Sequence, residues 1–352
     1  MRIRVIYGLI FLVIFSMFIN LQAKETQERN FETHLLFHPQ FHYEESHKKN
    51  TSGSEFYIRR VKFIFSGNVA KDISFMVGFI NKDFGLAGEN YFNLEVKDAY
   101  VEYKISRAFK INFGQVRLCM SRHMQQNSKR LHGMDYHSFF LVNTGDFKLH
   151  DLGVVFRGLL FNDKIDYRFA FANGKQETGE IGGDKNLRYI GRIGYNFFEP
   201  EPEFFWAGTF IGKRKVLSVG LSYDMEPGVG GEDGNSLYRA IAFDAFAEIP
   251  MGKNGIVSTF NYYNFNEGTI REKGQGFWAD FGYRINKLEP MIAYEWYKPD
   301  KGEKDKRISI LPGINYWLKG YNSNIKVEFG WTKMNDADEW DKKFIFQTQL
   351  FY

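Results

Sequence analysis

The stretch KIDYRFAFAN, residues 164–173, decides the fold. Its apolar side chains, Ile165, Tyr167, Phe169 and Phe171, recur at every second position, and the residues between them are charged or small. Side chains alternate between the two faces of a β-strand. The pattern therefore predicts a strand with one apolar face and one polar face.

The same alternation recurs along the chain, for example at 73–79, 99–105, 187–195 and 277–283. The segments are about ten residues long, whereas strands of soluble sandwiches usually have five or six. A tilted strand needs about ten residues to cross a bilayer. An apolar outer face with a polar interior is the pattern of a transmembrane barrel. We therefore expect an all-β fold, a transmembrane antiparallel β-barrel.

We count sixteen strands, the first near 34–44 and the last near 342–352. Long and short connections alternate between them, as in outer-membrane barrels. The exception is 198–214, where 204–212 has the pattern of a seventeenth strand. An odd number would reverse the order of the later connections, so we interpret this segment as an elaborated periplasmic turn.

The last strand carries a further signal. Phe344, Phe346, Thr348, Leu350 and Tyr352 share one face, and the chain stops on an aromatic residue. This ending resembles the assembly signal of bacterial outer-membrane barrels. We expect a multi-pass barrel in the outer membrane of the cell.

Composition excludes several classes of protein. The chain has 352 residues, a formal net charge of +4 and one cysteine, so a disulfide scaffold is excluded. The charge is too small for a nucleic-acid-binding protein.

Residues 1–23 have the pattern of a cleaved secretory signal peptide: two arginines, an apolar run and a small residue at Ala23. The alternative is a membrane anchor, but the apolar run of about 14 residues is shorter than the roughly 20 of a spanning helix. The barrel domain then comprises residues 24–352.

Three segments together resemble the phosphate-selective porin O and P family: FYIRRVK at 56–62, KDAYVEY at 97–103, and FGQVR at 113–117 followed by Ser121 and Arg122. The resemblance runs from about residue 34 to the C-terminus. It implies a homotrimer of sixteen-stranded barrels that pass small anions, phosphate or related oxyanions among them, past lumenal arginines and lysines. It also implies that an extracellular loop, here 118–150, folds inward at a constriction.

The face opposite the apolar one supplies candidate pore-lining residues. The candidate anion-binding and pore-lining set is Arg60, Lys62, Asp98, Arg117, Ser121, Arg122, Arg168, Arg188 and Arg192. A low-dielectric pore focuses the charges of its wall and so selects ions by sign. Two alternatives stay open. The lumenal charges could pair with one another, or the basic loop could lie outside the pore and attract the phosphates of lipopolysaccharide and other outer-membrane lipids.

No motif of a hydrolase, metalloprotease or nucleotide-binding loop occurs, so we expect no enzyme activity and no cofactor. His34, His38 and His42 are about 13 Å apart on a strand, too far for one metal ion. The remaining alternative function is a structural sleeve, a barrel that a partner protein in an outer-membrane complex fills and that has no open pore.

Overall fold

The computed structural model describes residues 30–46, 51–88, 92–137, 150–174, 186–230, 236–266, 274–300, 306–335 and 339–352. The predicted signal peptide lies outside these residues. Within the part of the chain that is described, no helix has the length and apolarity to cross a membrane.

The described residues form sixteen strands, in agreement with the sequence-based count. They are β1 (Asn30–Ser46), β2 (Thr51–Ala70), β3 (Ile73–Phe84), β4 (Glu95–Lys104), β5 (Lys110–Arg117), β6 (His150–Leu160), β7 (Ile165–Ala172), β8 (Arg188–Asn196), β9 (Val216–Gly230), β10 (Ser236–Met251), β11 (Asn254–Asn266), β12 (Gly274–Ile285), β13 (Leu288–Pro299), β14 (Arg307–Tyr316), β15 (Ser323–Met334) and β16 (Asp341–Phe351). Three short 3-10 helices, Leu86–Gly88, Ser128–Arg130 and Gly320–Asn322, lie between them.

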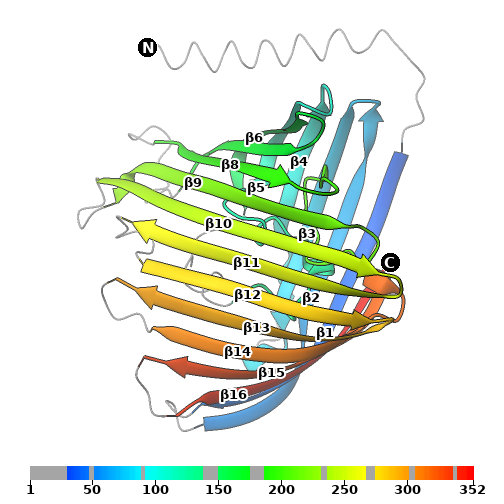
Figure 1. Ribbon diagram of the computed structural model, residues 1–352, viewed down its shortest axis with the longest axis vertical. Helices are drawn as coiled ribbons and strands as arrows, with labels where there is room; N and C mark the ends of the chain where they lie inside the picture. The colour runs from blue at the N-terminus through cyan, green and yellow to red at the C-terminus, as the bar shows by residue number, and fades with distance from the viewer. Residues whose placement is uncertain are drawn as a thin grey trace.

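Each strand pairs with its neighbours in the sequence, and β1 pairs with β16, so the sheet closes into a barrel (Figure 1). The closing pair is antiparallel and runs from Leu36 opposite Phe351 to Glu45 opposite Lys342. Closure leaves no strand edge without a partner, which is what a lipid environment demands of a sheet.

Tight turns join the strands at the end that holds the C-terminus (Figure 1). Two residues connect Met251 to Asn254, and Gly252 there has a φ of +64°. Two residues also connect Ile285 to Leu288, where Asn286 has a φ of +56°. Glycine and asparagine tolerate this left-handed conformation, which two-residue hairpins require.

The alternation in the sequence has the predicted structural meaning. In β7, Asp166, Arg168 and Ala170 are buried inside the barrel, whereas Phe169 is 40% exposed on its outer face. In β16, Phe346 is likewise exposed. The barrel is therefore apolar outside and polar inside, as the sequence analysis predicts.

Some strands are longer than predicted. The β1–β2 ladder continues to Ser46 opposite Thr51, beyond residue 44, near which we predict that the first strand ends. This rim is polar on both faces, with Glu44 and Glu45 adjacent in β1. An antiparallel ladder can continue in water without an apolar face, so the amphipathic pattern locates the membrane part of a strand and not its end.

The connection from β8 to β9 contains no strand among residues 197–215, which confirms the predicted turn. Its course is unexpected, however. Phe204, Trp206 and Phe210 are each less than 8% exposed. The turn folds back into the barrel because these rings pack there, as described below.

Candidate functional site: the barrel lumen

The lumen is occupied by the segment Leu118–His137, which leaves the end of β5. We call this segment the lumenal loop. Ser121 lies near its start, and its hydroxyl is hydrogen-bonded to the Tyr263 hydroxyl of β11 at 2.6 Å. The backbone N–H of Arg122 donates to an Asp244 carboxylate oxygen of β10 at 3.1 Å. The loop thus reaches strands that are not neighbours of β5.

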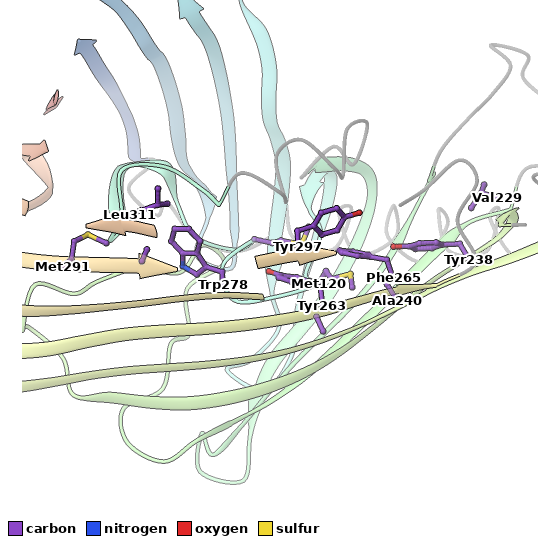
Figure 2. Packing of buried hydrophobic residues seen from close by; sticks show 13 residues of the cluster. Met120, Val229, Tyr238, Ala240, Tyr263, Phe265, Trp278, Met291, Tyr297 and Leu311 are labelled. Carbon is purple, nitrogen blue, oxygen red and sulfur yellow. The ribbon is translucent and has the colours of Figure 1, made fainter. Parts of the chain in front are cut away.

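An apolar cluster supports this docking. Met120 and Met124 of the loop pack against inward-facing aromatic side chains of β10–β13. Figure 2 shows the cluster as a row along these strands, from Val229 and Tyr238 to Trp278 and Met291. Methionine side chains adapt their shape to aromatic surfaces, which suits them to join a loop to a preformed wall.

Interactions between charged side chains hold the far end of the lumenal loop. The His132 imidazole is 2.7 Å from an Asp280 carboxylate oxygen through Nδ1 and 3.1 Å from Glu289 through Nε2. Burial acts to lower the pKa of His132, but the two carboxylates outweigh burial and raise this pKa to about 10. The ring is therefore an imidazolium at neutral pH.

Lys326 of β15 caps the same end. Its ammonium donates to the backbone carbonyls of Leu131, His132 and Gly133 at 2.7, 3.2 and 2.6 Å. Three carbonyl dipoles satisfy the three donors of one ammonium group. The lumenal loop therefore crosses the interior from β5 to β15.

The turn between β8 and β9 meets the loop inside the barrel. We call its part 200–210 the inner turn. The N–H of Trp206 donates to Gln125 O at 2.9 Å, the N–H of Asn127 donates to Trp206 O at 3.0 Å, and the N–H of Gly208 donates to Arg130 O at 2.8 Å. Backbone hydrogen bonds thus join two segments that start from opposite ends of the strands.

Guanidinium groups surround the Trp206 ring. Arg168, Arg192 and Arg122 have their Cζ atoms 3.8, 4.6 and 5.9 Å from the ring centroid. Such cation–π contacts strengthen when water is excluded. Arg122 also forms a two-point ion pair with Glu201 of the inner turn, through Nη2 at 2.6 Å and Nε at 3.1 Å.

All nine candidate residues of the sequence analysis lie inside the barrel, and each is at most 6% exposed. They are Arg60, Lys62, Asp98, Arg117, Ser121, Arg122, Arg168, Arg188 and Arg192. The structure brings Ser121, Arg122, Arg168 and Arg192 together around the junction of the loop and the inner turn. Arg188 is apart from this group, in a two-point ion pair with Asp224.

Most of the candidate cations have carboxylate partners. Lys62 is 2.5 Å from Asp98, Arg60 is paired with Asp135, and Arg192 is 2.6 Å from Asp244. Arg117 differs. Its recorded contacts are with the Gln126 carbonyl, the Tyr136 hydroxyl and the rings of Tyr136 and Phe205. No carboxylate pairs with it among the residues that the structure describes.

Sequence reasoning missed the acidic partners Glu201 and Asp244, together with Trp206. Asp244 could have been found, because it lies on the inward face of β10 by the same alternation that locates the arginines. Glu201 and Trp206 lie in a turn, where no periodicity indicates direction. Among the described residues, no group of three or more His, Cys, Asp and Glu side chains is arranged to hold a metal ion.

Cavities lie on both sides of the loop. One, of about 680 Å³, lies at the end of the barrel where the long connections join the strands, and its lining includes Glu44, Asp341 and Lys342. The other, of about 610 Å³, is lined by residues at the opposite end, including Lys104, Lys110 and Phe205. We call these the outer and the inner vestibule.

Comparisons with known proteins agree with this architecture. Residues 31–246 match the model of the family described as phosphate-selective porin O and P. A search of curated proteins found no significant match.

Among solved structures, the chain is similar to an anion-selective porin from Comamonas acidovorans, with 12% identity, a TM-score of 0.62, and 92% of this chain and 100% of the other covered. It is also similar to the outer-membrane channel DcaP of Acinetobacter baumannii, with 13% identity, a TM-score of 0.60 and coverage of 94% and 99%. A third is the trimer form of OmpT from Vibrio cholerae, with 13% identity, a TM-score of 0.56 and coverage of 93% and 100%. At these identities the likeness concerns the fold.

Proposed function

Because the chain belongs to the phosphate-selective porin O and P family, we propose that this outer-membrane porin passes small anions by passive diffusion, with phosphate and related oxyanions as candidate solutes. The porin fold and the outer-membrane barrel follow from the family and from the sixteen closed strands. The preference for anions and the identity of the solute are the proposal.

One observation carries the proposal. Arg117 lies where the lumenal loop leaves the wall, and its hydrogen-bond partners are neutral oxygens of Gln126 and Tyr136. Neutral acceptors orient the guanidinium without an ion pair, and the carboxylate that acts on it electrostatically, that of Asp98, is already paired with Lys62. In a confined lumen such a charge lowers the energy of a passing anion and raises that of a cation.

Arg168 supports the same reasoning. Its guanidinium donates to Phe204 O at 2.7 Å, to Glu203 O at 2.9 Å and to Gln125 Oε1 at 3.1 Å. The nearest carboxylate, that of Asp166, is 3.6 Å from Nε. The guanidinium of Arg168 is therefore less closely paired than those of Arg122, Arg188 and Arg192, whose carboxylate partners lie at hydrogen-bond distance.

The proposal extends to the assembly. A homotrimer is supported by the trimeric OmpT neighbour and by the family. The exposed apolar side chains of the strands would contact outer-membrane lipid, including lipopolysaccharide at the outer leaflet. Residues 1–23 would be removed on export. We propose no cofactor and no enzyme activity.

The reversal potential in a KCl gradient tests the anion preference. The purified protein in planar bilayers should pass chloride in preference to potassium. Arg117→Met keeps the apolar stem of the side chain and removes the charged guanidinium. The permeability ratio should fall roughly two- to tenfold, since tenfold corresponds to about 1.4 kcal/mol and pore water screens part of one charge.

The control is Lys287→Gln, which removes one positive charge from an exposed rim turn where Lys287 Nζ donates to Leu318 O at 3.1 Å. It should leave the ratio unchanged. A wild-type channel that prefers potassium would contradict the proposal. A protein that inserts and does not conduct would favour the sleeve.

A further inference from the structure

The inner vestibule has a basic wall that the protein itself does not neutralise. Six basic side chains line it, Lys104, Arg107, Lys110, Lys129, Arg130 and Arg157, against two acidic ones, Glu102 and Glu203. Both carboxylates are already in ion pairs, Glu102 with Arg157 and Glu203 with Arg214. Arg107 is 2.6 Å from Asp163.

Four cations are left without a recorded carboxylate partner among the described residues: Lys104, Lys110, Lys129 and Arg130. Lys110 donates to the Pro202 carbonyl at 3.2 Å. Lys129 lies 3.6 Å from the Phe351 ring centroid, and Arg130 lies 5.3 Å from that of Tyr321. Arg130 Nε is buried without a hydrogen-bond partner. These four cations thus differ from the arginines around Trp206, which have carboxylate partners.

Burial of Lys129 disfavours its charged form unless an anion lies nearby. The Lys129 ammonium is surrounded by protein and by the neighbouring Arg130 charge, and both effects lower its pKa, to about 7. An anion in the vestibule would reverse this shift, because it stabilises the charged form of the lysine.

The same vestibule has an apolar wall. Met76 and Tyr100 line it from β3 and β4, and Phe204 and Phe205 line it from the inner turn. The Tyr100 and Phe204 rings are 5.0 Å apart between centroids, and the Phe204 and Phe205 rings are 5.0 Å apart as well. These rings form one continuous aromatic surface beside the cations.

Size and lining fit a small organic molecule. Ligand sites typically enclose about 300–1,000 Å³, with apolar walls and a few polar groups that fix orientation. The inner vestibule has about 610 Å³. A fully hydrated inorganic ion would use the cations and leave the aromatic surface without a contact.

We propose that the inner vestibule is a binding site for amphiphilic organic anions, molecules that join a phosphate or carboxylate group to an aromatic body. The acid group lies against Lys104 and Lys110, and the aromatic body lies against Phe205 and Tyr100. The inner turn contributes Pro202, Glu203, Phe204 and Phe205 to this site, which gives its course into the lumen a role in binding. The inference deepens the proposed function by adding an organic class of solute.

Isothermal titration calorimetry on the detergent-solubilised protein tests this site without requiring an open pore. Phenyl phosphate and inorganic phosphate are the two probes. Phenyl phosphate should bind at least about tenfold more tightly than inorganic phosphate, since burial of an aromatic ring supplies the difference.

Two variants test the basic part and the aromatic part of the site separately. Lys104→Gln with Lys110→Gln should weaken the binding of both probes by about tenfold or more, because the charged hydrogen bonds are lost. Phe205→Ala should weaken phenyl phosphate alone. The control Lys342→Gln removes a cation from the outer vestibule, where Lys342 is 3.5 Å from Glu45, and should change neither affinity.

Folding of each variant is checked by its migration on unheated gels. If the double variant fails to fold, Lys104→Glu at the exposed end of β4 replaces it. Equal affinity for the two probes, or phenyl phosphate binding that survives Phe205→Ala, would overturn the inference. Failure of the anion preference in the KCl gradient, with phenyl phosphate still bound, would overturn the proposed function alone.

Discussion

The ion pair between Arg122 and Glu201 joins the lumenal loop to the inner turn, and its removal is the sharpest perturbation of the lumen. Both side chains are buried, at 1% and 5% exposure, and the guanidinium also donates to Ala207 O at 2.7 Å. Glu201→Gln keeps the shape of the side chain and removes the counter-charge. Breaking a buried pair in this way costs about 3–5 kcal/mol, because the remaining charge stays out of water.

We expect Glu201→Gln to release the inner turn before the barrel unfolds. The second ion pair of this turn provides the control: Glu203 lies 3.0 Å from Arg214, and these side chains are 43% and 20% exposed. Surface pairs are worth about 0–1 kcal/mol, so Glu203→Gln should have little effect.

Trp206 reports directly on the docking, because it lies against Arg168 and Arg192. The fluorescence of the protein is measured as a function of urea concentration. Subtracting the signal of a Trp206→Phe variant removes the contribution of the other five of the six tryptophans. The transition of Trp206 should move to lower urea in Glu201→Gln and stay in place in Glu203→Gln.

A double-mutant cycle completes the test. The cycle consists of Arg122→Met, Glu201→Leu and their combination. The double variant removes both charges of the pair and should be less destabilised than Glu201→Leu alone, since neither partner is left buried without its counter-charge. If Glu201→Gln shifts the transition no more than Glu203→Gln does, or if the coupling is below about 0.5 kcal/mol, the pair does not hold the inner turn.

Three further predictions concern the loop, the wall and the C-terminus. The pKa of His132 is raised from 6.5 to about 10, so its contribution to loop docking is complete below pH 6.5 and is lost as the pH rises through about 10. Conductance noise should therefore increase near pH 10. The variant His132→Gln should remove this pH dependence. Lys326→Met removes the ammonium donor from three loop carbonyls, of which that of His132 still accepts from Asn315 Nδ2 at 2.9 Å, and should raise the protease sensitivity of the lumenal loop, whereas the exposed Lys319→Met should not. Phe346→Arg on the outer face of β16 should cost about 2–4 kcal/mol if it lies at the bilayer midplane, and deletion of Tyr352 should lower outer-membrane levels; unchanged levels of both would show that these residues are ordinary strand sequence.

The sequence by itself determined the barrel. The alternation at 164–173 is a local property of the chain, because successive side chains of a strand point to opposite faces whatever surrounds them. The same rule places Arg168, Arg188 and Arg192 in the lumen and Phe169 outside. Strand number follows from counting, and the order of long and short connections correctly identifies 198–214 as a turn.

The tertiary structure alone decided what fills the lumen and which charges remain free. Arg122 meets Glu201 and Asp244, 79 and 122 positions further along the chain, and the inner turn reaches the lumenal loop through Trp206. Such partners depend on closure of the barrel, which brings distant strands to face each other across one interior. Periodicity describes the direction of a side chain on its own strand and carries no information about what lies opposite, so the free charge of Arg117 and the paired charge of Arg122 look alike in the sequence.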